Sequence, residues 1–162
     1  MRELAQAFRF PGATERQLAH VLATAPLVGA GSIFGSRTVE STSTEESVRY
    51  AIGFEPAPIP LLRFDVEISQ KETSSATLVL LEFTQPQRQR PYLAGQFVWM
   101  LKDEPGAAVL HEEINTRAAL EIVSRPLHGS ALSLRRWLFF KGGHQRLMKE
   151  TAGNIRKLLA VS

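Results

Sequence analysis

From residue 36 to about residue 120, hydrophobic and polar positions alternate with a period of two, the spacing of strands that bury one face of a sheet. The clearest strand patterns cover residues 48–54, 62–68, 77–83, 97–101 and 107–120. Turn-forming residues separate these segments. The pattern therefore predicts a meander of antiparallel strands, with a long last strand.

The turns allow a test of this meander, because residues that face each other across an antiparallel pair share one side of the sheet. We close three hairpins, at Ser43-Thr44, near residues 71–75 and at residues 103–106. The resulting pairs are Val39 with Val48, Ile68 with Thr77, Val66 with Val79, Phe64 with Leu81, Leu101 with Ala108, Trp99 with Leu110, and Phe97 with Glu112. Each hairpin then has one consistent apolar face.

The first 35 residues predict one strand and two short helices. Residues 4–10 alternate, with Leu4, Gln6, Phe8 and Phe10 on one side, and Pro11-Gly12 ends the strand. Thr14 is a good N-cap for a helix whose apolar residues recur to Ala25. Pro26 starts a second short helical piece, which the following glycines keep irregular.

A long amphipathic helix is predicted at the C-terminal end. Its apolar positions follow the helix period and include Leu147, Met148, Thr151, Ile155, Leu158 and Leu159. Gly142-Gly143 breaks the pattern, so we expect the helix to begin near His144. The sequence as a whole predicts an α+β fold.

Composition limits the class of protein. The 162 residues fit one domain, 1–162, and contain no cysteine, which excludes disulfides, thiolate metal sites and a cysteine nucleophile. The start of the sequence lacks the apolar stretch of a signal peptide, and no segment approaches the roughly 18 apolar residues of a membrane span. We expect a soluble, cytoplasmic protein.

The net charge of +3 is distributed unevenly. From Arg125 onward the chain has Arg125, Arg135, Arg136, Lys141, Arg146, Lys149, Arg156 and Lys157 against one acid, Glu150. A solvated helix face is the favoured interpretation. Peripheral contact with an anionic membrane is the alternative, and we predict no specific nucleic-acid partner.

Glu112 is the most informative single residue, because the predicted register places its carboxylate on the apolar face of the sheet. Such a group either orients or protonates a ligand, or it is a structural residue paired with an arginine such as Arg117 or turned to the edge by a bulge. Tyr50 is the second candidate for catalysis. The structural interpretation of Glu112 is favoured.

The other candidate residues and motifs give only weak evidence for catalysis or metal binding. His111 and Glu113 point to one side of a strand, but no third ligand follows, so we predict a polar surface row and no metal site. His144 is interpreted as a cap or surface residue at the helix entry. The motifs of serine hydrolases, phosphate loops, dinucleotide folds and zinc proteases are absent, and no cofactor is predicted.

The order of strand, two short helices, antiparallel strands and long C-terminal helix resembles the START-like, or helix-grip, superfamily. That superfamily includes polyketide aromatase/cyclases, birch-pollen-allergen-type proteins and lipid-transfer domains. The likeness covers nearly the whole chain and includes the basic, apolar ending Ile155-Arg156-Lys157-Leu158-Leu159. The chain departs from many bacterial members at Gly31 to Gly35, where they have a tryptophan-proline pair. An NTF2-like cone is the rival fold, but the glycines there disfavour its long N-terminal helices.

The resemblance implies a six- to seven-stranded sheet curved around the last helix, with a ligand cavity between them. The residues expected to line this cavity are Tyr50, Phe54, Phe64, Phe83, Phe97, Trp99, Glu112, Met148, Thr151 and Ile155. The function we expect is binding or transport of a hydrophobic small molecule such as a lipid, isoprenoid or polyketide. An aromatase/cyclase-like enzyme that uses Glu112 and Tyr50 is one alternative, and an interaction module that uses the basic helix is another.

Overall fold

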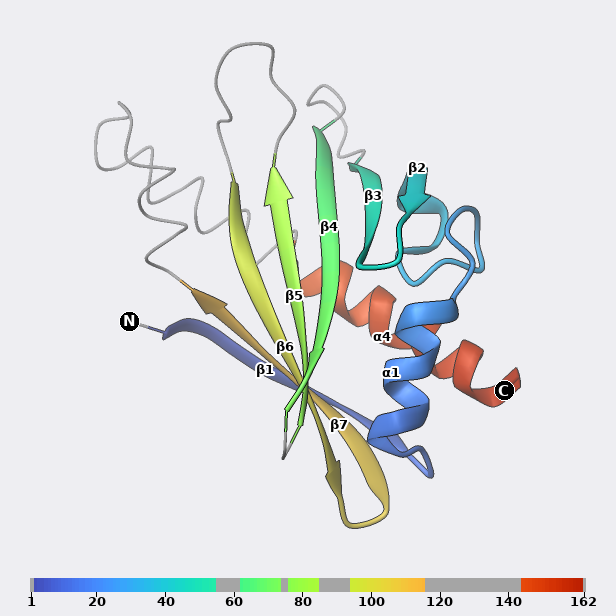
Figure 1. Cartoon of the computed structure of the whole chain (residues 1–162), viewed down its shortest axis with the longest axis vertical. Coiled ribbons are helices and arrows are strands. Elements are labelled where there is room, and N and C mark those ends of the chain that lie inside the picture. The colour runs from blue at the N-terminus through green and yellow to red at the C-terminus, as the bar shows by residue number, and fades with distance from the viewer. Residues whose placement is uncertain (1, 55–61, 74–75, 85–93, 116–143, 162) are drawn as a thin grey trace.

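The computed structural model describes residues 2–54, 62–73, 76–84, 94–115 and 144–161 (Figure 1). Its elements are, in chain order, β1 Arg2–Pro11, α1 Glu15–Thr24, the 3-10 turn η1 Gly35–Arg37, β2 Thr38–Ser43, β3 Ser47–Phe54, β4 Leu62–Glu72, β5 Thr77–Thr84, β6 Ala94–Glu104, β7 Ala107–Asn115 and α4 Gln145–Val161. The predicted α+β class is confirmed.

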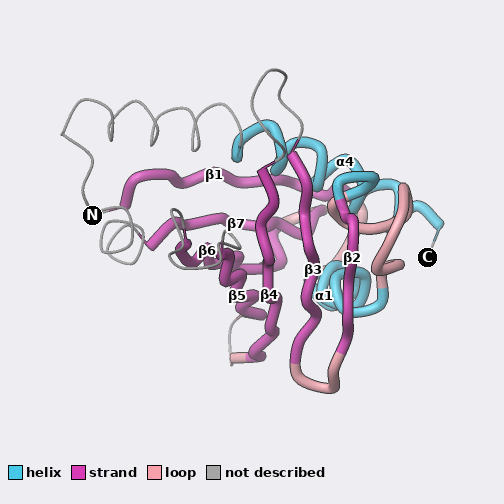
Figure 2. Tube along the Cα trace, turned by 90° about the horizontal axis from the view of Figure 1, so that it is seen from above, coloured by secondary structure: helices cyan, strands magenta, loops and turns pink. Residues whose placement is uncertain are grey.

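All seven strands belong to one antiparallel sheet with the order β1-β7-β6-β5-β4-β3-β2. The strands from β2 to β7 form the predicted meander, and β1 returns to pair with β7. Seen from above, the strands follow an arc, and α1 and α4 lie on its inner side (Figure 2). The predicted curved sheet around a C-terminal helix is confirmed.

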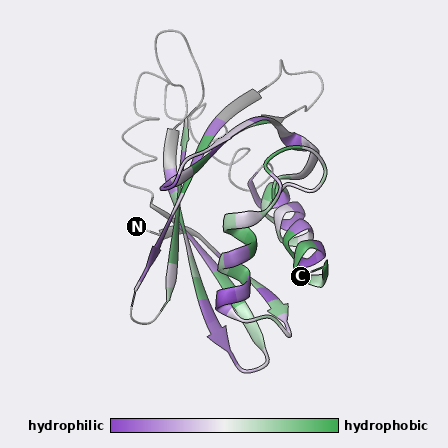
Figure 3. Cartoon of the chain, turned by 45° about the vertical axis from the view of Figure 1, so that its right-hand side comes forward, coloured by the Kyte–Doolittle hydropathy of each residue, from purple (hydrophilic) through white to green (hydrophobic). Residues whose placement is uncertain are grey.

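The hydrophobic core lies between the concave face of the sheet and the two helices. The sheet contributes alternate residues of its strands, and α1 contributes Leu18, Val21 and Leu22. Met148 and Ile155 of α4 join the same core. Hydrophobic and hydrophilic positions alternate along both helices and along the strands, as Figure 3 shows. α1 and α4 therefore bury one side each, as the periodicity predicted, whereas β7 buries the consecutive residues Ala107 to Leu110 on both sides.

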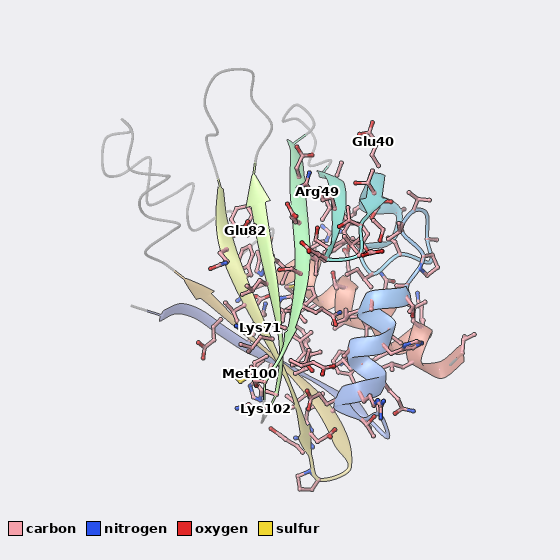
Figure 4. The ribbon with its side chains drawn as sticks, in the orientation of Figure 1. Glu40, Arg49, Lys71, Glu82, Met100 and Lys102 are labelled. Carbon is pink, nitrogen blue, oxygen red and sulfur yellow. The ribbon has the colours of Figure 1, made fainter. Side chains whose placement is uncertain are left out.

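The opposite, convex face of the sheet is mixed in character. Arg49, Lys71, Glu82 and Lys102 come from four neighbouring strands and are exposed, and Figure 4 labels them. Each follows or precedes an inward-facing residue, because side chains alternate across a strand. Leu78, Leu80, Val98 and Met100 lie on this same side and are half-buried, so the convex face is charged in part and apolar in part.

The predicted start of α1 is confirmed. Thr14 is the N-cap, and its Oγ1 accepts a hydrogen bond from the Gln17 backbone N–H at 3.2 Å. Gln17 Oε1 accepts one from the Thr14 backbone N–H at 2.9 Å, which completes a capping box. The second helical piece predicted from Pro26 does not form: residues 26–34 are turns and bends, and the single 3-10 turn η1 follows at Gly35–Arg37.

The three predicted hairpin registers are wrong by two or four residues, although the apolar residues described in β3 to β7 lie on the predicted side. Leu101 faces Leu110, Ile68 faces Leu81 and Val48 faces Ser43. In β6–β7 the loop is Pro105-Gly106 alone, with Gly106 at a φ of +74°, which suits the third position of a type II turn.

The other two turns also lie further along the chain than predicted, and a threonine closes each of them. Thr44 N–H donates to Ser47 O at 2.8 Å, and Thr73 N–H donates to Ala76 O at 2.9 Å. The hydroxyl oxygen of each threonine accepts the backbone N–H three residues later at 3.1 Å. These paired bonds fix the turn positions, and hence the registers.

The ends of the last two elements agree with the sequence pattern as far as they are described. The strand predicted over residues 107–120 is confirmed to Asn115, and α4 begins at Gln145, next to the predicted His144. The other residues of that strand, Arg117 and the Gly142-Gly143 break lie outside the described residues. Within the described part of the chain, no helix has the length and apolar character needed to cross a membrane.

Candidate functional site

Most of the residues predicted to line a cavity lie buried in the core on the inner side of the sheet. They are Tyr50, Phe83, Phe97, Trp99, Glu112, Met148, Thr151 and Ile155, each at most 5% exposed. Phe54 and Phe64 belong to β3 and β4, but their side chains lie outside the described residues. A binding role for the eight buried residues stays a prediction, whereas their shared location in the core is observed.

Glu112 is fully buried, accepts two hydrogen bonds and lies within hydrogen-bond distance of a third group. Trp99 Nε1–H donates to Oε2 at 2.7 Å, and Gln6 Nε2–H donates to Oε1 at 2.9 Å. His144 Nε2 lies 2.6 Å from Oε1. The bulge that would have turned this carboxylate to the sheet edge is absent, because the pairing of β7 with both neighbours is regular at Glu112.

The neighbours of Glu112 follow from the register. Glu112 faces Trp99 on β6 and Gln6 on β1, not Phe97 as predicted. Across an antiparallel pair, facing side chains on one side of the sheet lie about 4.5–5.5 Å apart at Cβ. The three strands therefore bring one carboxylate, one indole N–H and one amide together on an otherwise apolar face.

His144 completes the cluster from the start of α4. It is 6% exposed, so the surface role predicted for it is wrong. Its ring stacks on Phe97, with centroids 4.2 Å apart and an angle of 4° between the planes. Phe97 in turn stacks on Phe83 at 4.7 Å, so a column of three rings runs from β5 to α4. This stacking fixes the plane of the imidazole against Glu112.

Tyr50 lies in the same core and is 2% exposed. Its ring meets Phe34 edge-on at 5.1 Å. Desolvation raises the pKa of Tyr50 to about 12, because burial disfavours the phenolate. At neutral pH this residue is therefore a neutral phenol, which can donate or accept a hydrogen bond but does not act as a base.

Thr151 presents a buried hydroxyl without a partner. It is the only side-chain nitrogen or oxygen of the described residues that is both sealed from solvent and unbonded. Threonine in a helix commonly bonds the carbonyl one turn earlier, but Thr151 does not. Thr151 follows His144 by seven residues, two turns, so both lie on the face of α4 that also contains Met148 and Ile155. A hydroxyl left in this state costs about 1–3 kcal/mol.

A hollow of about 210 Å³ adjoins the cluster. Its described lining comes from β1 and β7: Gln6, Ala7, His111, Glu112 and Glu113. Pockets that enclose drug-sized ligands measure roughly 300–1,000 Å³, so this hollow alone is large enough only for part of such a molecule. Ala7, His111 and Glu113 alternate with Gln6 and Glu112 along the two strands, so most of this lining belongs to the convex side of the sheet and not to the concave face.

Other candidates from the sequence have structural roles. His111 Nε2 lies 3.5 Å from Glu104, and no group of three metal-ligating residues occurs in the described ranges. Of the basic residues, Arg156 donates to Arg9 O at 3.2 Å and packs over the Phe10 ring. Arg146 pairs with Glu150.

Glu150 connects α4 to η1. Its carboxylate binds Arg37 at 2.7 Å as well as Arg146. The hydrogen bond from Arg37 is the main cause that lowers the pKa of Glu150. Part of the basic surface of α4 is therefore used within the chain itself.

Gln6 is the residue of this cluster that the sequence did not single out, and His144 is the residue for which the sequence favoured a cap or surface role over a place at a pocket mouth. Gln6 was placed on the apolar side of the first strand, and a polar side chain in that position was the available signal. For His144 the signal was its spacing of four and seven residues from Met148 and Thr151. Both residues become informative only once Glu112 is known to lie opposite them.

Two solved structures share this fold. One is the di-domain ARO/CYC protein StfQ from the steffimycin biosynthetic pathway, with a TM-score of 0.54, 10% identity, and coverage of 97% of this chain and 52% of that one. The other is the di-domain ARO/CYC protein BexL from the BE-7585A biosynthetic pathway, with a TM-score of 0.53, 11% identity, and coverage of 96% and 50%. The chain thus spans about half the length of these proteins.

The likeness establishes the fold, and the chain has the helix-grip architecture that the sequence resemblance implied. No protein-family model matches the sequence, and no curated protein matches it. Below 25% identity a common fold does not carry function with it. The function must therefore be argued from the Glu112 cluster.

Proposed function

We propose that this protein binds a small, mostly apolar molecule that carries a polar oxygen group, and that the concave face of the sheet holds it. The observation that carries this proposal is the Glu112–His144 pair, buried in an apolar core and bonded to Gln6 and Trp99. Removing such groups from water costs several kcal/mol, so their presence in a core favours a functional site over a purely structural one.

The shape and chemistry of the face support this class of ligand. Aromatic side chains such as Tyr50, Phe83 and Phe97 offer apolar contact, while Gln6 and Glu112 offer polar contact on the same face. Sites for small molecules commonly combine apolar walls with a few convergent polar groups. A polyketide, an isoprenoid or a lipid with an oxygenated end fits this description, and the ARO/CYC proteins of the same fold favour the first.

The proposal is tested by native mass spectrometry of the purified protein, followed by titration with the bicyclic ketone 1-tetralone. We expect either a co-purified hydrophobe or saturable binding of 1-tetralone that quenches or shifts Trp99 fluorescence, since Trp99 bonds the carboxylate. Trp99→Phe is the control for that signal. A protein that carries no hydrophobe and shows no saturable binding would overturn the proposal.

A second candidate function is that of an enzyme of the aromatase/cyclase type. The specific observation in its favour is again the carboxylate–imidazole pair, because a histidine oriented by a carboxylate is a recurrent acid–base unit. Tyr50 can serve this chemistry only as a neutral hydrogen-bond donor, given the pKa of about 12. Turnover of a bound ketone, rather than affinity alone, separates the enzyme from the carrier.

A further inference from the structure

We propose that two copies of this chain associate through the convex faces of their sheets, and that the Lys102 ammonium of each copy pairs with the Glu82 carboxylate of the other. These faces lie on the side of the sheet away from the Glu112 cluster. The inference therefore goes beyond the proposed ligand binding and does not depend on it. Its basis is an apolar patch with opposite charges at its two ends.

The apolar patch lies on two neighbouring strands, β5 and β6, and consists of Leu78, Leu80, Val98 and Met100. Val79 and Trp99, which alternate with these residues, lie in the core on the concave side, so the four side chains point to the convex side. Leu78 faces Met100 and Leu80 faces Val98 across the strand pair. Facing side chains on one side of a sheet touch, so the four form one contiguous group.

This patch is at the middle of the sheet, where the convex face projects furthest. β6 and β5 are the third and fourth of the seven strands, and the strands follow an arc with α1 and α4 on its inner side (Figure 2). The four side chains are only half-buried in the single chain. Covering them with a second surface would stabilise the contact by roughly 25 cal/mol for each Å² of apolar area removed from water.

The charges at the ends of the patch have opposite signs. Lys102 lies two residues beyond Met100 on β6, and Glu82 lies two residues beyond Leu80 on β5. Because the two strands are antiparallel, these charges are at opposite ends of the patch, roughly 20 Å apart along the strands (Figure 4). Both are exposed, and neither forms an ion pair with another described residue.

Glu82 also has an unfavourable neighbour within its own chain. It faces Glu67 of β4 directly across the strand pair. Like charges in facing positions destabilise a sheet, although Arg49 on the far side of Glu67 offsets part of this repulsion. A cation supplied from outside the chain would therefore be favourable at Glu82.

A two-fold axis makes this face complementary to itself. If the axis lies between two such faces and runs across the strands, it places the patch of one copy on the patch of the other with the ends exchanged. Lys102 and Glu82 are equally far from the centre of the patch, so each Lys102 comes level with the partner's Glu82. The two are offset by one strand spacing of about 4.8 Å, which a lysine side chain can span. This charge complementarity selects a second copy as the partner.

The dimer should be weak. Two convex faces touch mainly along their middle strands, so the contact falls at the low end of specific interfaces, below about 1,200 Å² in total. We expect a dissociation constant of roughly 10–100 µM. Two ion pairs at the ends of an apolar centre match the usual arrangement of a polar rim around a protein interface.

The experiment is sedimentation equilibrium of the whole chain over about 5–500 µM, a range that brackets the expected dissociation constant. The variants are Lys102→Glu, Glu82→Lys, the double reversal of both, and Met100→Gln. The double reversal keeps the net charge of +3. Matched controls are Lys149→Glu on α4 and Glu46→Lys in the turn between β2 and β3, both at exposed positions outside the patch. Circular dichroism establishes that each variant is folded.

Each single reversal acts twice in a symmetric dimer, so Lys102→Glu and Glu82→Lys should each raise the dissociation constant at least about tenfold. The double reversal should return it to within about threefold of wild type, and the controls should change it less than about twofold. Met100→Gln should raise it at least about fivefold, because it places an amide at the centre of the patch.

A chain that stays monomeric over the whole range would overturn the inference, whatever else covers the patch. A dimer that Lys102→Glu and Met100→Gln leave unchanged would also overturn it, since that dimer would use another surface. A double reversal that dissociates as readily as the single reversals would show that Lys102 and Glu82 do not pair, and would overturn it as well. None of these results would affect the proposed ligand binding, which concerns the concave face.

Discussion

The two ends of the concave face differ sharply in chemistry although one continuous core covers both. Under α1, the sheet meets Leu18 and Leu22, and the neighbouring inward residues Val79 and Leu101 are fully buried and apolar. Under the first turn of α4, residues with similar burial are Glu112 and His144. Burial alone therefore does not distinguish structure from function here. The distinguishing feature is that one end contains groups whose burial opposes folding.

The largest effect is expected from breaking the buried pair. His144→Leu should destabilise the protein by about 3–5 kcal/mol, because Glu112 then keeps its charge in the core without its closest partner. Glu112→Leu/His144→Leu should be far more stable than the sum of the single changes predicts. Urea unfolding of the two single variants and the double variant measures this coupling. Additive effects would show that the pair is not coupled.

At the apolar end, Leu101→Ala should cost about 2–5 kcal/mol, since a fully buried leucine leaves a cavity. The dissociation constant of 1-tetralone should stay within about twofold of wild type, because Leu101 belongs to the packed end of the face. Urea unfolding and the titration with 1-tetralone give the two values. A large loss of binding in folded Leu101→Ala protein would remove the distinction between the two ends.

The pKa of Tyr50 reports how well water is excluded from the concave face between these two ends. Since its folded pKa is raised to about 12 from 10.0, the folded state binds this proton more tightly than the unfolded chain does. The protonated Tyr50 phenol therefore contributes about 2–3 kcal/mol to the free energy of unfolding. This contribution is fully present below pH 10 and is lost as the pH rises toward 12. Ultraviolet titration of wild type against Tyr50→Phe resolves the phenol. A transition near pH 10 would show that water reaches the ring.

The smallest effect is expected at Thr151. Thr151→Val should raise the free energy of unfolding by about 1 kcal/mol, because it removes a buried hydroxyl that no described group satisfies. If that hydroxyl binds a second oxygen of the ligand, the same variant should also weaken binding of a diketone more than binding of 1-tetralone. The variant Thr151→Ser serves as the control, because it keeps the hydroxyl. A destabilised Thr151→Val protein would show that the hydroxyl has an intramolecular partner.

The sequence predicted which side of the sheet each residue points to better than it predicted which residue lies opposite it on the neighbouring strand. A slip of two or four residues leaves every side chain on its original side of a strand, so the alternation determined which residues point inward but could not determine the register. Phe97 was therefore placed opposite Glu112, where Trp99 lies. The turn-closing roles of Thr44 and Thr73 were the signals that would have corrected two registers.

The site itself could be predicted only in part. Glu112 stood out because a carboxylate broke an apolar pattern within one strand. Gln6 and His144 could not be joined to it, because their contacts depend on the pairing of β1 with β7 and on where α4 crosses the sheet. Such long-range contacts depend on how the whole core packs, and the local periodicity of the sequence carries no information about that packing.

The Glu112 cluster joins segments that are far apart in the chain: Gln6 is 106 residues from Glu112, and His144 is 32 residues from it. A cluster of such high contact order cannot assemble until the first strand has docked on the last hairpin and the terminal helix has closed over both. During synthesis, a ribosome-bound chain would thus hold this carboxylate in water until late. Assembly of the cluster and completion of folding would then coincide.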